Sequence, residues 1–133
     1  MKILLVSNGS LADAMLESMK NYFSQPELTT ICFEQQHWKK ARQEVADALV
    51  SALRQNPRES ILVLCDTFGS TAFIETAILL EKMGLRQQSL MLCGMNLPMV
   101  FKLYGLKDTA TLQLCRSLYE EDSLHGTRLY AYA

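Results

Sequence analysis

Three short polar turns hold the residues of this chain that could do chemistry, and each turn directly follows an apolar run. The turns are Ser7–Gly9 (SNG), Asp66–Thr71 (DTFGST) and Gly94–Pro98 (GMNLP). They carry a carboxylate, carboxamides and hydroxyls, which bind and orient ligands through hydrogen bonds. Open α/β sheets bind ligands just beyond the carboxyl ends of their strands. If the apolar runs are parallel strands, the three turns predict one shared site.

The first two turns place their polar side chains most specifically. Asn8 and Gly9 precede a predicted helix, whose free backbone N–H groups would favour an anion such as phosphate. Asp66 comes directly after an apolar run, so its carboxylate could orient a neighbouring imidazole or accept a hydrogen bond. Ser70 and Thr71 lie at the next predicted helix start, where the usual role of a hydroxyl is capping. Asn8 has the most exposed position for a nucleophile, but a carboxamide is not one.

The glycines and the third turn shape the backbone more than they supply reactive groups. Gly69 belongs to the second turn, and Asn96 and Pro98 follow a glycine in the third. Glycine, asparagine and a proline in the first helical turn are typical of an ordered connection. The chain contains no G-x-G-x-x-G or Walker sequence, so nucleotide binding has little support.

The other reactive side chains are four cysteines and two histidines. No C-x-x-C pair occurs, which favours buried, reduced thiols over disulfides or zinc. A catalytic Cys65 or Cys93 is the alternative, and no adjacent histidine supports it. His37 follows the second predicted strand and could approach the site, although a solvated loop residue beside Trp38 is the more ordinary interpretation. We expect neither a metal nor a cofactor.

Composition bounds the class of protein. The chain has 133 residues, of which 49% are hydrophobic, and its net charge is −1. This length predicts a single domain over residues 1–133, with enough apolar residues for a core. The mixed charges do not favour a nucleic-acid surface. No segment is long enough to span a membrane, and Met1–Val6 is too short for a signal-peptide core, so we expect a cytoplasmic protein.

Strands and helices are expected to alternate. Continuous apolar runs are typical of parallel strands that are covered on both faces. Ser10, with Asp13 three residues on, predicts the cap of the first helix. The second strand is β-branched and apolar, and the third is the clearest of the four. The four strands are expected over Ile3–Val6, Thr29–Phe33, Ile61–Cys65 and Ser89–Cys93.

Helices are expected after each of these strands. Apolar residues at helical spacing continue the first helix from Leu11 to Tyr22 and mark the second, which Asn56 and Pro57 close. The third begins at Ser70 or Thr71, carries its apolar positions at Ile74, Ile78 and Leu79, and ends at Gly84. The last two helices are expected over Leu97–Tyr104 and Thr109–Tyr119.

The β-α-β-α-β-α-β pattern requires right-handed crossovers and a parallel sheet, which makes the fold α/β. The last segment, Arg128–Tyr132, alternates polar and apolar residues. Such alternation is typical of an edge strand with one buried face.

Taken together, the three turns resemble the IIA domain of the mannose-family sugar phosphotransferase system. That family has a Ser-His-Gly turn after its first strand. Its second signature reads roughly Asp-Leu-x-x-Gly-Ser/Thr-Pro-x-Asn, and its third reads Gly-x-Asn-Leu-Pro-Met. The corresponding segments here are Ser7–Gly9, Asp66–Ile74 and Gly94–Met99, and the last matches in full. The resemblance runs through the whole chain in order and spacing.

The resemblance implies a three-layer fold with a four-stranded parallel sheet in the order 2-1-3-4. It also implies a final antiparallel strand, here Arg128–Tyr132, which is exchanged between the subunits of a homodimer. The family works in the cytoplasm or beside a membrane sugar permease. Its histidine takes a phosphoryl group from a histidine phosphocarrier protein and passes it to a IIB domain.

The resemblance also assigns roles to residues of the site. Asp66 matches the aspartate that orients the histidine, and Thr71 matches a hydroxyl that helps to bind the phosphoryl oxygens. Gly9, Gly69, Ser70, Asn96 and Pro98 belong to the same binding motifs. The chain departs at the decisive position, because Asn8 stands where the family has its phosphorylated histidine.

Two further departures lie close to the site, since Ala72 and Ile74 replace the family's proline and asparagine. The sequence therefore leaves three functions open. The chain is a IIA component that has lost phosphoryl transfer at Asn8, a regulatory paralogue that binds partners without phosphate, or a small-molecule-binding α/β enzyme. His37 is the alternative phosphate acceptor.

Overall fold

The central sheet has the predicted strands and order. The computed structural model describes residues 1–121 and 124–131. Within them, four strands form one parallel sheet in the order β2-β1-β3-β4. This order places β1 between β2 and β3, so the ends of all three lie side by side. The strands are β1 (Lys2–Asn8), β2 (Thr29–Phe33), β3 (Ile61–Cys65) and β4 (Ser89–Cys93).

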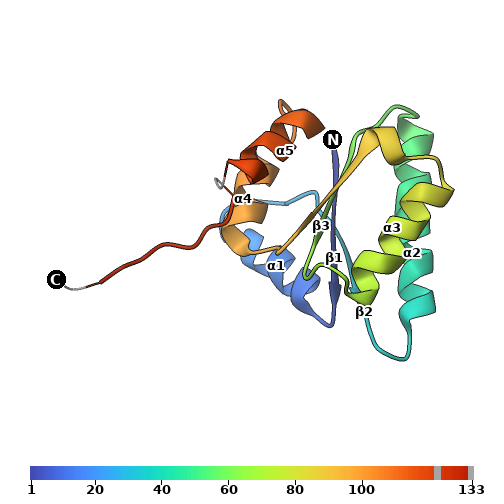
Figure 1. The fold of residues 1–133 in the computed structure, drawn as a ribbon, viewed down its shortest axis with the longest axis horizontal. Helices are drawn as coiled ribbons and strands as arrows, with labels where there is room; N and C mark the ends of the chain where they lie inside the picture. Colours follow the sequence, from blue (N-terminus) through green and yellow to red (C-terminus); the bar gives the residue numbers. More distant parts are fainter. Residues whose placement is uncertain (122–123, 132–133) are drawn as a thin grey trace.

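Helices cover both faces of the sheet, which confirms the three-layer α/β fold (Figure 1). Two helices lie on one face, α2 (Trp38–Gln55) and α3 (Thr71–Lys82), and a short 3₁₀ turn over Arg86–Gln88 leads into β4. The other face carries α1 (Leu11–Met19), α4 (Leu97–Gly105) and α5 (Leu112–Glu120).

Two helix starts differ from the sequence prediction. Ser10 precedes α1 but makes no capping hydrogen bond with its side chain. The Ser7 hydroxyl accepts the Ala12 N–H instead, at 2.9 Å, while Asp13 accepts from the Thr30 hydroxyl at 2.6 Å. The last helix begins at Leu112 rather than at Thr109 because Thr111 caps it. In both cases another hydroxyl nearby has the better geometry for capping.

The apolar core lies on both sides of the sheet. All five residues of β3 are buried, as are the residues from Ile3 to Val6, and alternate side chains enter the two layers. In α3 the buried face carries Ala72, Thr76 and Leu80. Ile74 and Ile78, predicted as apolar positions of this helix, lie on its outer side with 45% and 41% of their surface exposed. Two of the three buried side chains of α3, Ala72 and Thr76, are therefore small.

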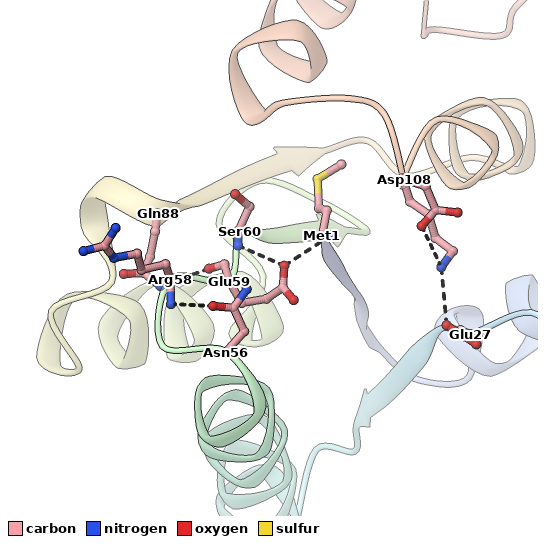
Figure 2. A network of polar contacts seen from close by, with 9 residues as sticks. Met1, Glu27, Asn56, Arg58, Glu59, Ser60, Gln88 and Asp108 are labelled. Carbon is pink, nitrogen blue, oxygen red and sulfur yellow. Dashed lines mark hydrogen bonds and ion pairs between the residues drawn. The ribbon is translucent and has the colours of Figure 1, made fainter.

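A polar network closes the amino end of the sheet, away from the three turns (Figure 2). Glu59 accepts a hydrogen bond from the Ser60 N–H at 3.1 Å and lies 3.2 Å from the Met1 amino group. The Gln88 amide donates to the Glu59 carbonyl at 2.9 Å. Beside β2, Lys107 pairs with Glu27 at 3.3 Å. Glu59 and Lys107 thus lie at the centres of two separate sets of polar contacts.

The C-terminal segment extends away from the body of the molecule (Figure 1). Residues 128–131 have no regular secondary structure, and Leu129 and Tyr130 are 92% and 81% exposed. The strand predicted over Arg128–Tyr132 does not form within this single chain, and Tyr132 lies outside the described residues. An exchanged strand would need a second subunit to pair with, so the exchange remains a prediction.

No helix of the described part of the chain combines the length and the apolar character needed to cross a bilayer.

Candidate functional site

Backbone and side-chain hydrogen bonds join the three turns at the carboxyl edge of the sheet. The Asn8 N–H donates to the Asp66 carboxylate at 2.8 Å. The Gly94 N–H donates to the Asp66 carbonyl at 3.0 Å. The turns after β1, β3 and β4 therefore meet, as the sequence predicts, and Asp66 lies between the other two.

A cleft of about 560 Å³ opens beside the first turn. Three of its lining residues were predicted to belong to the site, Asn8, Gly9 and Thr71. The other lining residues follow β2 or end it: Phe33, Glu34, Gln35 and Trp38. This second wall was not predicted from the sequence, although the predicted strand order places the end of β2 next to the end of β1.

Asn8 is held at both its backbone and its side chain. Besides the bond from its N–H to Asp66, its Oδ1 accepts the Ala72 N–H in the first turn of α3 at 3.0 Å. Gly9 follows in the left-handed region with φ +70°, which a residue with a side chain rarely adopts. The Gly9 N–H donates to the Phe33 carbonyl at 2.9 Å. The turn is therefore fixed against β2, β3 and α3.

Asp66 is a hub of hydrogen bonds. Its Oδ2 accepts from the Asn8 N–H, and its Oδ1 accepts from the Ser70 hydroxyl at 2.9 Å and the Cys65 thiol at 3.2 Å. Burial raises the pKa of the Asp66 carboxyl, but these bonds and one from the Thr67 N–H outweigh it, so the pKa lies below its usual value. The carboxylate is ionised at neutral pH and binds the main chain of Asn8.

The thiols near Asp66 do not support cysteine nucleophiles. Burial, followed by the hydrogen bond to Asp66, raises the pKa of Cys65 to about 12. Burial also raises the pKa of Cys93. A cysteine reacts as its thiolate, so both side chains lack the protonation state that catalysis needs. All four cysteines are free, and Cys65 and Cys115 are buried.

Ser70 and Thr71 have different roles at the start of α3. The Ser70 hydroxyl accepts the Phe73 N–H at 3.2 Å, which makes Ser70 the cap of the helix. Thr71 is the first residue of α3 and faces the cleft. Gly69, at φ +85°, provides the tight turn before them. Thr71 is therefore the hydroxyl available to a ligand.

Asn96 and Pro98 lie apart from the cleft. Asn96 caps α4 by accepting the Met99 N–H at 3.1 Å, and Pro98 lies in the first turn of that helix. Asn96 lines a separate pocket of about 340 Å³ together with Tyr119 and His125. The third motif thus shapes the backbone beside Asp66, while its side chains do not reach Asn8's cleft.

His37 does not line the cleft of Asn8. It is exposed and lines a neighbouring pocket with Cys32 and Glu44. Trp38 is the residue of this loop that faces the cleft, and its ring lies 5.2 Å from the Arg42 guanidinium carbon. Among the residues the structure describes, no three His, Cys, Asp or Glu side chains gather as a metal site would require.

The hydrogen bonds of Asp66 make a testable contribution to stability. We expect Asp66→Asn to lower the free energy of unfolding at neutral pH by about 1–3 kcal/mol, because an amide is uncharged and accepts at only one atom. The folded pKa is depressed, so this contribution is present above the unfolded pKa of about 3.9 and is lost as pH falls through the folded pKa. Urea unfolding between pH 7 and pH 3 measures it. Glu17→Gln, on an exposed side chain, is the matched control.

Comparisons with known proteins agree with this architecture. The family model described as "PTS system fructose IIA component" matches residues 2–117. A search of curated proteins finds no significant match.

Solved structures share the fold. The phosphotransferase system component EIIA from Streptococcus agalactiae is 23% identical, with a TM-score of 0.71 over 96% of this chain and 95% of that one. The mannose/sorbose specific IIA subunit from Enterococcus faecalis is 20% identical, with a TM-score of 0.70 over 99% and 98%. The PTS IIA protein associated with the fucose utilization operon of Streptococcus pneumoniae is 16% identical, with a TM-score of 0.71 over 91% and 89%.

The family model matches residues 2–117, and the sheet has the order 2-1-3-4 that the resemblance implied. The chain therefore belongs to the PTS system fructose IIA component family.

Proposed function

We propose that residues 1–133 form one IIA-type domain of a mannose-family phosphotransferase system that carries no phosphoryl group at its site. The observation that carries this proposal is the chemistry of the cleft. The residue at the carboxyl end of β1 is Asn8, and no histidine belongs to the lining found among the described residues. Asp66 and Thr71 are retained beside it.

The loss of transfer follows from the side chain itself. An imidazole nitrogen has a free lone pair that can accept and release a phosphoryl group. The nitrogen of the Asn8 carboxamide has its lone pair delocalised into the carbonyl, so it is a donor of hydrogen bonds and not a nucleophile. In this proposal, Asn8 occupies the position of the family's phosphohistidine. The fold around Asn8 is kept, although phosphoryl transfer is lost.

The partners in this proposal are those that IIA domains generally use. These are a IIB domain and the histidine phosphocarrier protein, with a second copy of this chain completing a homodimer through the C-terminal segment. We place the domain in the cytoplasm, beside a membrane sugar permease. A regulatory role, in which the domain binds such a partner without transferring phosphate, is the function that an inert cleft would leave in place.

The proposal predicts that the wild-type chain gains no phosphoryl group. The purified chain is incubated with phosphoenolpyruvate, enzyme I and the phosphocarrier protein, and intact-mass spectrometry is performed without acid. We expect no addition of one phosphoryl mass, while a histidine-bearing IIA domain in the same tube is fully modified. A stoichiometric gain would contradict the proposal, and its mapping to His37 would show that the chain is still a carrier with a displaced acceptor.

A further inference from the structure

The first N–H groups of α3 are satisfied by two different parts of the chain. An α-helix leaves its first N–H groups without partners inside the helix, and these groups take capping side chains or bound anions. In α3 the Phe73 N–H donates to Ser70, the local cap. The Ala72 N–H donates instead to Oδ1 of Asn8, 64 residues earlier in the chain and at the end of β1. Asn8 thus acts as a long-range cap of α3.

The geometry fixes Asn8 in this role. Its backbone N–H is bound to Asp66, and the next residue, Gly9, is bound to Phe33. These two bonds set the position of the Asn8 backbone, and the bond to Ala72 sets the direction of its side chain. Ala72 itself is fully buried against the sheet, so the start of α3 cannot shift away without disturbing the core.

Both partners in this hydrogen bond are departures from the family pattern. That pattern has histidine at the position of Asn8 and proline at the position of Ala72. Proline has no backbone N–H, so a chain with the family residues has no donor for this bond. The change to alanine creates the donor, and the change to asparagine supplies the acceptor. Two departures that are far apart in sequence therefore meet in one contact of 3.0 Å.

We propose that Asn8 and Ala72 work as a pair, in which the Asn8 amide oxygen is a built-in ligand that takes the place of a bound anion at the start of α3. In this arrangement the Asn8 side chain fixes the end of β1 to the start of α3, and no phosphate is needed to hold the two together. Asn8 is thus a positioning residue that joins β1 to α3. The inference rests on the proposed function in one respect, since the Ala72 N–H would otherwise be free to meet a phosphoryl group at this edge of the sheet.

The charges around the cleft fit an uncharged internal ligand. Glu34 lines the cleft, and the ionised Asp66 lies behind Asn8. The cleft lining contains no lysine or arginine among the described residues. Arg42, which lies near Trp38, is paired with Glu75 at 3.5 Å. A neutral amide oxygen is not repelled by these two carboxylates, whereas a free anion depends on the N–H groups at the start of α3 and on Lys39 and Arg42, which lie 5.6 and 5.2 Å from the Trp38 ring.

The consequence concerns how the domain is regulated. In a carrier, the charge at this edge changes whenever the phosphoryl group arrives or leaves. With a permanent amide ligand, the surface around Asn8 and Thr71 keeps the same charge and shape. A partner that docks at this edge would therefore bind with an affinity that does not respond to the supply of phosphoryl donor.

A double-mutant cycle tests the pair directly. We expect Asn8→Ala to raise the equilibrium constant for unfolding roughly tenfold, as the loss of a satisfied hydrogen bond does. In an Ala72→Pro background, where the donor is absent, we expect the same change to have no further effect. Ser10→Ala is the matched control, since the Ser10 side chain makes no capping bond in the neighbouring turn. Additive effects of the two substitutions would overturn the pair.

Nuclear magnetic resonance adds a readout that a purely structural role would not move. Inorganic phosphate is titrated into the wild type and into Asn8→Ala, and the amide signals of Thr71 and Ala72 are followed. We expect both signals to shift in the variant and to stay in place in the wild type at the same concentrations. We also expect exchange of the Ala72 amide proton to be at least tenfold faster in the variant.

The outcomes separate this inference from the proposed function. An equal phosphate response in both proteins, or unchanged exchange at Ala72, would overturn the built-in ligand. Exchange of the Ala72 amide proton in Asn8→Ala needs no substitution at position 72, so the test stands even where Ala72→Pro does not fold. Phosphorylation of wild-type His37 in the transfer assay would overturn the proposed function and leave the cap of α3 in place.

Discussion

An Asn8→His variant is expected to take up a phosphoryl group from the phosphocarrier protein, where the wild type takes up none. The substitution supplies a nitrogen with a free lone pair at the carboxyl end of β1. Asp66 and Thr71 are already beside it, and the Asp66 carboxylate is only 2.8 Å from the backbone nitrogen of this residue. The measurement is an acid-labile gain of one phosphoryl mass, from zero in the wild type to a readily detected fraction in the variant.

Two further substitutions test how the gained activity arises. Asp66→Ala in the Asn8→His background is expected to weaken phosphorylation, because the carboxylate no longer fixes the tautomer of the imidazole. Adding Ala72→Pro removes the N–H that Asn8 occupies in the wild type, and we expect it to preserve or increase the gain. His37→Ala is the control for modification elsewhere. If Asn8→His folds and stays unmodified, the chain has also lost docking of the donor.

The strands were predictable because their signal is local. All five residues of Ile61–Cys65 are buried. A continuous apolar run of this kind is typical of a parallel strand that is covered on both faces. The observed bounds of β2, β3 and β4 agree with the prediction, while β1, predicted over Ile3–Val6, extends from Lys2 to Asn8. The meeting of the three turns also followed, since parallel strands end at one edge of the sheet.

The details of the cleft were harder to predict from the sequence, because they depend on contacts between segments that are far apart in the chain. Trp38 and Gln35 line the cleft because β1 and β2 are neighbours in the sheet. The sequence around these two residues contains no motif that would identify them. Ser7 and Ser10 are both plausible caps for α1, and only the direction of the Ser7 side chain decides between them. The bond from Ala72 to Asn8 spans 64 residues and has no local signal.

The orientation of α3 illustrates the same limit. Ile74 and Ile78 suggest an apolar face, yet the helix turns Ala72 and Thr76 toward the sheet. Small side chains permit a close approach to the strands, and parts of two isoleucines stay in water. Periodicity alone gives the helix but does not choose between two apolar faces.

Removal of the residues from Gly126 onward is expected to convert a homodimer into a monomer that is prone to aggregate. In the single chain, residues 128–131 have no regular secondary structure and Leu129 is 92% exposed. Within the part of the chain that the structure describes, the outer edge of β4 has no partner strand in the sheet. An open sheet edge and an alternating segment without regular secondary structure can pair between two copies of the chain, with closed two-fold symmetry.

The truncation is designed to spare the core. Leu124, which is buried, remains in the shortened chain, so a change of assembly does not require unfolding of the domain. Light scattering coupled to size-exclusion chromatography, at micromolar concentrations, gives the mass of each form. We expect two chains for the full-length protein and one for the truncated protein, with soluble aggregate at higher concentration because strand edge and apolar surface are uncovered.

A point variant isolates the backbone pairing from the loss of side chains. Leu129→Pro removes one N–H donor from the segment, and proline is not tolerated in a strand that pairs on that side. Leu129→Ala keeps the backbone donor and removes a comparable apolar surface. If the segment is exchanged as a strand, the proline variant should dissociate at concentrations where the alanine variant stays dimeric. A full-length monomer, or a dimer that survives the truncation, would refute the exchange, because in either case the C-terminal segment would not be what joins two copies of the chain.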